Sequence, residues 1–201
     1  MNTRHFCLAL GLATMAPVAS AQLKPPSYFA TISDQTARSA ALFTEAGKVI
    51  ESPRCLNCHP ATRRPTQGDD LHTHVPPMRA GVSGMPCSSC HGGSTVATVA
   101  SSIESIPGHP RWALAPVSMA WQGKSLPEIC EQIKDPARNG GRSLATIHEH
   151  MATDSLVGWA WHPGSGRAPA PGTQREFGAL IKAWVSTGAQ CPKAQPTRTP
   201  G

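Results

Sequence analysis

Two pentapeptides in this sequence bring together residue types that can bind a metal-containing cofactor covalently. Residues 55–59 and residues 87–91 both read Cys-x-x-Cys-His. Two cysteines three positions apart can form thioether bonds with the two vinyl groups on one edge of a porphyrin, and the histidine that follows can ligate the iron. The sequence therefore predicts two covalently bound c-type haems, attached at Cys55, Cys58, Cys87 and Cys90 and ligated by His59 and His91.

Paired cysteines have two other interpretations. Four cysteines can hold zinc, but 28 residues separate the two pairs, which is longer than the usual spacing in zinc sites. A Cys-x-x-Cys redox pair normally accompanies a βαβ unit, for which this segment rich in proline and glycine has no pattern. A histidine directly after both pairs favours haem, and a zinc-stabilised binding module stays as an alternative.

Each haem iron needs a second axial ligand unless it is open to small molecules. We rank His150 first, on an expected helix over residues 143–153, and His74 or His72 next. On an extended segment His72 and His74 point the same way, and only one of them need face iron. Met119 is the best sulfur candidate; methionine ligation raises the potential, whereas bis-histidine ligation gives low potentials. A vacant position would indicate a haem enzyme, peroxidase-like, or a gas or redox sensor.

The spacing of the motifs determines how the chain must enclose two haems. His59 and His91 are 32 residues apart, which is too few for a separate small cytochrome c domain around each haem. We therefore expect one wrapping of chain in which the haems lie close together and replace much of the side-chain core. Trp159 and Trp161, in a loop rich in aromatics and glycine, could stack near a haem edge.

The elements that must position these residues are expected to be helices joined by long loops. The chain of 201 residues contains 20 prolines and 18 glycines, which disfavours extended regular structure. Patterns of caps and apolar spacing predict helices over residues 34–51, 125–135, 143–153 and 173–187. The predicted fold is mainly α, a compact multihaem-type cytochrome c with little or no sheet. We expect a single domain over residues 22–192 and a disordered tail over residues 193–201.

The remaining cysteines and the N-terminus indicate the compartment. Residues 1–21 have the charged, apolar and small-residue regions of a secretory signal, and Cys7 lies within them. We therefore expect export to a bacterial periplasm, with no membrane span after cleavage. In an oxidising compartment the two cysteines outside the motifs, Cys130 and Cys191, are expected to form a disulfide. The chain has a formal charge of +6, but it lacks the cluster of basic residues with interleaved aromatics that is typical of nucleic-acid-binding proteins.

The order of the motifs resembles a known family. Besides the two Cys-x-x-Cys-His motifs, the chain has a Gln-Gly-Asp run leading to His72 and His74, Lys-Asp-Pro-x-Arg-Asn-Gly-Gly-Arg at residues 134–142, and Pro-Ala-Pro-Gly-Thr at residues 169–173. Together they resemble the bacterial proteins labelled isoquinoline 1-oxidoreductase subunit. The resemblance implies a cytochrome that takes electrons from a periplasmic molybdenum hydroxylase, and does not itself hydroxylate a substrate. We expect an electron-transfer protein rather than an enzyme, whose partners are redox proteins.

Overall fold

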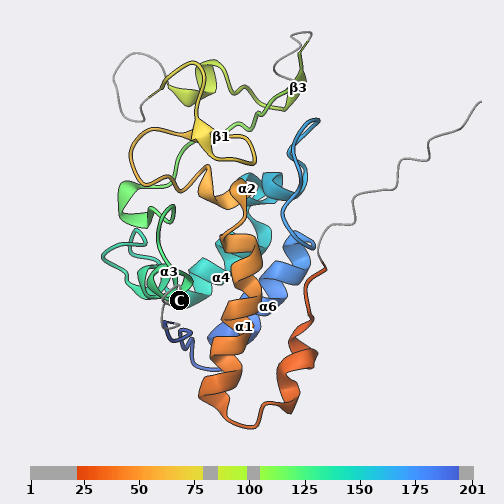
Figure 1. The fold of residues 1–201 in the computed structure, drawn as a ribbon, viewed down its shortest axis with the longest axis vertical. Coiled ribbons are helices and arrows are strands. Elements are labelled where there is room, and N and C mark those ends of the chain that lie inside the picture. The colour runs from red at the N-terminus through yellow and green to blue at the C-terminus, as the bar shows by residue number, and fades with distance from the viewer. Residues whose placement is uncertain (1–21, 79–85, 99–104, 195–201) are drawn as a thin grey trace, which may run out of the picture.

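The computed structural model describes residues 22–78, 86–98 and 105–194. The predicted signal sequence and residues 195–201 of the predicted tail lie outside the described residues. As predicted, the chain is mainly helical, and its strands form two short hairpins. Figure 1 shows the long helices gathered in one half and the hairpins, with most of the loops, in the other. No helix in the described ranges is long and apolar enough to cross a bilayer.

The helical half is built from four helices that begin at cap residues. The four are α1 (Gln35–Ile50), α3 (Leu126–Lys134), α4 (Leu144–Thr153) and α6 (Gln174–Ser186). The side chains of Asp34, Ser143 and Thr173 accept hydrogen bonds from backbone N–H groups of the first turns of α1, α4 and α6. Glu128 accepts from the backbone N–H of Ser125 at 2.7 Å at the start of α3. The four predicted helices are therefore confirmed, with ends set by side-chain caps.

The shorter elements position the rest of the chain. They are the helices α2 (Pro53–Leu56) and α5 (Ser155–Gly158), the 3-10 turns η1 (Pro26–Thr31), η2 (Cys87–Ser89), η3 (Val117–Met119) and η4 (Trp159–Trp161), and the strands β1 (Thr66–Gln67), β2 (His72–Thr73), β3 (Val96–Ala97) and β4 (Ser105–Ile106). Strands β1 and β2 pair antiparallel, and so do β3 and β4.

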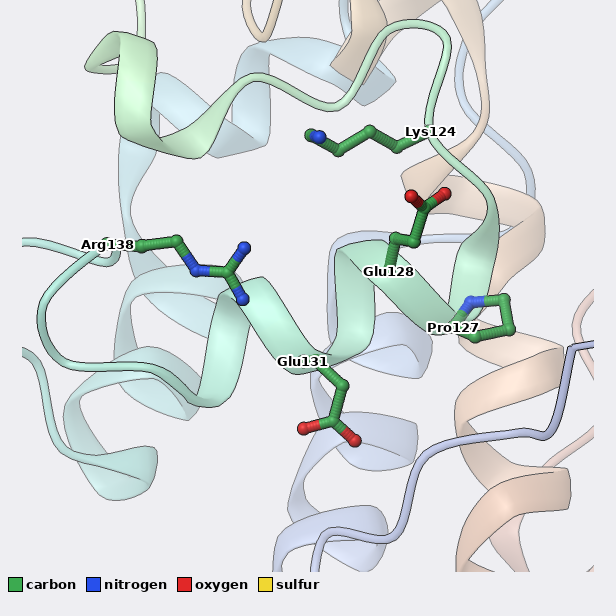
Figure 2. Close-up of a pocket in the computed structure, with 5 residues that line it drawn as sticks. All are labelled: Lys124, Pro127, Glu128, Glu131 and Arg138. Atoms are coloured by element: carbon green, nitrogen blue, oxygen red, sulfur yellow. The ribbon is translucent and has the colours of Figure 1, made fainter.

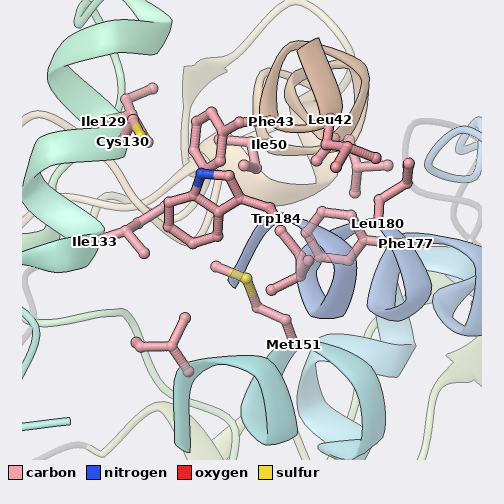
Figure 3. Close-up of a cluster of buried hydrophobic side chains, with 14 of the residues drawn as sticks. Leu42, Phe43, Ile50, Ile129, Cys130, Ile133, Met151, Phe177, Leu180 and Trp184 are labelled. Atoms are coloured by element: carbon pink, nitrogen blue, oxygen red, sulfur yellow. The ribbon is translucent and has the colours of Figure 1, made fainter. Parts of the chain in front are cut away.

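The helical half has a hydrophobic core made of side chains. Figure 3 shows Trp184 of α6 at its centre, against Phe43 of α1, with ring centroids 4.8 Å apart. Side chains of α3 and α4 close the cluster, among them Ile129, Ile133 and Met151. The expectation that haems replace much of the side-chain core is therefore wrong for this half, which stabilises itself by ordinary apolar burial.

Close backbone approach brings α4 against α6. A Cβ added at Gly178 of α6 would lie 2.6 Å from the Cβ of Ala152 in α4. Only glycine leaves room at this crossing. Helix α4 carries His150, the first-ranked candidate for a distal ligand.

The predicted disulfide between Cys130 and Cys191 is confirmed. It joins α3 to the segment that follows α6, across 61 residues of sequence. On the chain-entropy estimate, closing a loop of this length stabilises the folded state by about 4 kcal/mol.

Candidate functional site

The first Cys-x-x-Cys-His motif lies on one helical turn directly after α1. Cys55 belongs to α2, and the N–H of His59 donates to the Cys55 carbonyl at 3.0 Å. Residues spaced by three and four positions share one side of such a turn, so Cys55, Cys58 and His59 lie together. Burial raises the pKa of the Cys55 thiol to about 12 and that of the Cys58 thiol to about 11. Both cysteines are half-buried.

The imidazole of His59 is held in one orientation and one tautomer. Its Nδ1 lies 2.7 Å from the carbonyl oxygen of Met119. Burial lowers the pKa of His59 to about 4, so the ring is neutral at pH 7. Because a carbonyl can only accept, the proton is on Nδ1 and the lone pair is on Nε2. Trp121 stacks on the ring with centroids 3.5 Å apart and an angle of 7° between the planes. His59 therefore presents Nε2 as a potential metal ligand.

The loop over residues 115–122 forms the back of this first site. Its backbone N–H groups donate to the carbonyls of Cys58 and His59, from Ala115 at 3.0 Å and from Trp121 at 2.9 Å. The indole Nε1 of Trp121 is buried and has no hydrogen-bond partner among the described residues. Since buried donors are nearly always paired in folded proteins, this orphaned N–H suits an acceptor such as a haem carboxylate.

His150, the first-ranked candidate for a distal ligand, acts electrostatically on His59. Burial is the largest cause of the lowered pKa of His59, and the hydrogen bond with the Met119 carbonyl opposes it. The positive charge of His150 lowers this pKa further. Burial also lowers the pKa of His150 itself. Nδ1 of His150 lies 3.3 Å from Oδ2 of Asp154, which leaves Nε2 for another partner. A carboxylate on the far nitrogen is the usual arrangement of a metal-binding histidine.

The second motif repeats the arrangement of the first with different partners. It begins in η2, and the N–H of His91 donates to the Cys87 carbonyl at 2.9 Å. Nδ1 of His91 lies 2.7 Å from the Pro107 carbonyl, and Trp112 stacks on the ring with centroids 4.8 Å apart. Burial lowers the pKa of His91. The second site is the more open one, because Cys90 is exposed.

His74, rather than His72, lies against the second motif. The ring centroids of His74 and His91 are 5.8 Å apart, with an angle of 59° between the planes. Nδ1 of His74 lies 2.8 Å from the Pro76 carbonyl, so its Nε2 also keeps the lone pair. His72 is exposed instead, with Nδ1 2.6 Å from Oδ1 of Asp70. The structure thus brings one histidine of this pair to the motif and leaves the other at the surface.

The other ranked candidate, Met119, lies behind His59. Its carbonyl contacts Nδ1 of that ring, on the side away from Nε2, and the residue is buried in the core.

His109 also differs from the four motif-linked histidines. Its Nδ1 accepts from the N–H of Arg111 at 3.1 Å, and its Nε2 lies 2.9 Å from the Ser155 hydroxyl. The proton of neutral His109 is therefore on Nε2, and this tautomer has no lone pair there for a metal.

A buried arginine connects the first motif to the hairpin that carries His74. Arg54 is only 3% exposed; it forms an ion pair with Asp69 and donates to the Gly68 carbonyl at 3.2 Å. Asn57, inside the motif, donates to the same carbonyl at 2.8 Å. The turn between β1 and β2 is thereby attached to α2. One motif thus helps to position the histidine that lies against the other.

Sequence reasoning missed four residues that shape these sites: Arg54, Trp112, Trp121 and Asp154. Asp154 offered a signal, because a carboxylate four positions after His150 faces it at a helix end. The two tryptophans offered none, since each stacks on a histidine from a distant segment. Of the two tryptophans expected near a haem, Trp159 packs edge-on against Trp112 at 5.0 Å, whereas Trp161 packs on Phe177 of α6.

A separate small pocket lies on α3, away from both motifs. Figure 2 shows its five lining residues, Lys124, Pro127, Glu128, Glu131 and Arg138. Its volume is about 290 Å³. Glu128 is engaged in the helix cap, and Arg138 pairs with Asp135 at 2.9 Å. Glu131 pairs with Lys134 at 3.4 Å, so three of the four charged side chains around this pocket already have partners within the protein.

Within the described ranges, no group of three or more His, Cys, Asp or Glu side chains is placed to hold a metal ion. The four motif cysteines are therefore not gathered around one zinc ion. Comparison with protein-family models, with curated proteins and with solved structures finds no match to this chain.

Proposed function

We propose that this protein is a periplasmic dihaem c-type cytochrome that relays single electrons. Cys55 and Cys58 would hold one haem, and His59 and His150 would bind its iron. Cys87 and Cys90 would hold the other, and His91 and His74 would bind its iron. The observation that carries the proposal is the state of these four histidines. Each has Nδ1 against a carbonyl or carboxylate oxygen. The rings of His74 and His91 lie 5.8 Å apart, and the charge of His150 lowers the pKa of His59.

The residues present fit two haems. Two imidazoles on opposite sides of one metal, with metal–nitrogen bonds of about 2 Å, have ring centroids about 6 Å apart. The spacing of 5.8 Å between His74 and His91 agrees with this. The orphaned Nε1 of Trp121 supplies a donor for a haem carboxylate beside His59.

A haem held at each motif supplies a couple between ferrous and ferric iron, which gains and loses one electron. The chain contributes the rest. Met119 and Pro107 fix the tautomers of His59 and His91 through their carbonyls, so each ring offers a lone pair. Trp121 and Trp112 stack on these rings and restrict their rotation. With two histidines to bind each iron, the chain would leave no position for a substrate, which suits electron relay rather than catalysis.

The proposed partners are redox proteins of the periplasm. The sequence resemblance indicates a molybdenum hydroxylase as the electron donor, with another cytochrome or a terminal acceptor of the respiratory chain as the recipient. Each electron that arrives from the donor leaves to the acceptor, so the cytochrome itself is unchanged after one cycle.

Purification from a periplasmic fraction tests the proposal. The mature protein should carry the mass of two haems, show a sharp α-band near ~550 nm on reduction and have low-spin spectra without the near-infrared band of sulfur ligation. The reduced protein should not bind CO. Zinc without visible absorbance would contradict the haem assignment, and CO binding at one iron would indicate an open site and a sensor or enzyme instead.

A further inference from the structure

The junction between α4 and α5 carries a carboxylate that contacts His150. Asp154 is the C-cap residue of α4 and the N-cap residue of α5, and its side chain is 19% exposed. Its Oδ1 accepts from the N–H of Leu156 at 2.8 Å and from the guanidinium of Arg111 at 3.1 Å. Its Oδ2 lies 3.3 Å from Nδ1 of His150. Two contacts on one oxygen thus fix the direction of the other oxygen toward the histidine.

The segment over residues 109–112 connects this junction to the second motif. Arg111 reaches Asp154, and His109 lies 2.9 Å from the Ser155 hydroxyl, so both contacts attach the segment to the start of α5. The next residue, Trp112, stacks on His91. Arg111 therefore contacts Asp154, the partner of His150, whereas the next residue, Trp112, contacts His91 of the second motif.

We propose that Asp154 is the positioning residue of His150, held in place by Arg111, and that it sets the potential of the haem bound at residues 55–59. This inference rests on the proposed function. A negative oxygen on Nδ1 makes an imidazole a stronger donor, and a stronger donor stabilises ferric over ferrous iron. Removing that charge should therefore favour the ferrous state of this haem.

The test is Asp154→Asn in the complete, haem-loaded protein. Asparagine is as good a helix cap as aspartate, so the start of α5 is preserved and only the charge is lost. At the wild-type midpoint potential of the affected haem, we expect about a tenfold rise in its ferrous-to-ferric ratio, which corresponds to 59 mV for one electron. Its electron paramagnetic resonance g-values should change as well, and the second haem should keep both properties. Asp154→Ser, which also retains a cap, should give the same result.

Asp135→Asn is the matched control. Asp135 likewise caps a helix end, accepts from the N–H two positions later at 2.9 Å and pairs with an arginine at 2.9 Å, but none of its partners is a histidine. It should leave both potentials unchanged. If the wild type contains two low-spin haems and Asp154→Asn leaves both potentials and all g-values as they were, the inference fails alone. If the wild type lacks bis-histidine haems, the proposed function fails first.

Discussion

At the scale of single residues, the hydrogen bond on one nitrogen of a histidine determines what the other nitrogen can do. His74 and His109 show the contrast. The Pro76 carbonyl accepts from Nδ1 of His74, so the lone pair is on Nε2. In His109 the backbone N–H of Arg111 donates to Nδ1, so the proton is on Nε2 and that nitrogen has no lone pair for a metal. Residue type alone does not separate them, because both are histidines in loops, one or two positions before a proline. The partners of the ring decide which one can bind iron.

His74→Ala should open the iron of the second haem, because it removes the distal ligand that we assign there. We expect CO to bind to one of the two haems in the reduced variant, and the spectrum of that haem to become high-spin. His72→Ala is the matched control, two positions away on the same hairpin and exposed. It should bind no CO. CO binding by His72→Ala but not by His74→Ala would reverse the assignment of the ligand.

At the scale of the elements, short loops are held in place by side chains of neighbouring segments. The hairpin of β1 and β2 is too short to be stable alone. It is attached to α2 through Arg54 and Asn57, which both bind its turn. Burial lowers the pKa of Arg54, whereas the nearby Asp69 raises it, which shows that the guanidinium is partly desolvated.

Arg54→Ala should destabilise the protein by about 2 kcal/mol, less than for a fully buried pair because Asp69 is 53% exposed. It should also weaken ligation by His74, since the hairpin that carries this residue loses an attachment. Urea unfolding and CO binding measure the two effects. Arg64→Ala removes an exposed arginine from the same connection and should change neither. Equal stability of both variants would show that Arg54 does not anchor the hairpin.

The crossing of α4 and α6 gives a second prediction for an element. Gly178→Ala would gain about 1 kcal/mol of helix propensity, but the added methyl group would collide with Ala152, and overpacking costs about 1–3 kcal/mol. We expect a net loss of stability of about 1 kcal/mol and a change in the spectrum of the first haem, because α4 carries His150. Lys182→Ala, at an exposed position of α6, serves as the control and should alter neither. A more stable Gly178→Ala protein would contradict the close packing of the two helices.

At the scale of the whole molecule, the hydrophobic core lies in the helical half and the second Cys-x-x-Cys-His motif lies in the loop-rich half, whereas the first motif lies between them and packs against the core. The core around Trp184 and the disulfide both belong to the helical half (Figures 1 and 3). The loops around the motifs have few regular elements and depend on single hydrogen bonds. The helical half therefore acts as a scaffold for the loops that carry the two motifs.

Replacing both Cys130 and Cys191 by alanine should lower the free energy of unfolding by about 4 kcal/mol, since the unfolded chain gains freedom. The visible spectrum should stay the same, because the bond lies outside the loops of both motifs. Urea unfolding with and without reductant checks this. Reductant should destabilise the wild type and leave the double variant unaffected. A wild type that does not respond to complete reduction would show that the bond adds no stability.

The two haems should have different potentials because their surroundings differ in exposure. Cys55 and Cys58 of the first motif are both half-buried, whereas Cys90 of the second motif is exposed. Low polarity disfavours the additional positive charge of ferric iron, so the first haem should have the higher reduction potential. A difference of about 60 mV would correspond to a tenfold difference between the ferrous-to-ferric ratios of the two haems. Redox titration of single-haem variants, Cys55→Ala with Cys58→Ala and Cys87→Ala with Cys90→Ala, measures each haem separately. A higher potential for the haem at residues 87–91 would contradict this order.

Much of the local structure could be predicted from the sequence. The helix over residues 143–153, the cap at Ser125 and the pairing of Cys130 with Cys191 were confirmed, because caps, apolar spacing and leftover cysteines are local or compositional signals. The apolar core was underestimated, since its members are spread over four separate helices.

The sequence by itself determined where the two motifs lie and which residue types they offer. The two cysteines and the histidine of each motif are close in the chain, so one turn brings them together without any tertiary contact. Only the tertiary structure decided which second histidine accompanies each motif. Packing of segments that are distant in the chain brings His74 to His91, and it places His150 where its charge lowers the pKa of His59. The same packing supplies the carbonyls of Met119 and Pro107 that set the tautomers. Such partners cannot be identified from spacing, because contacts between distant segments depend on how the whole chain packs.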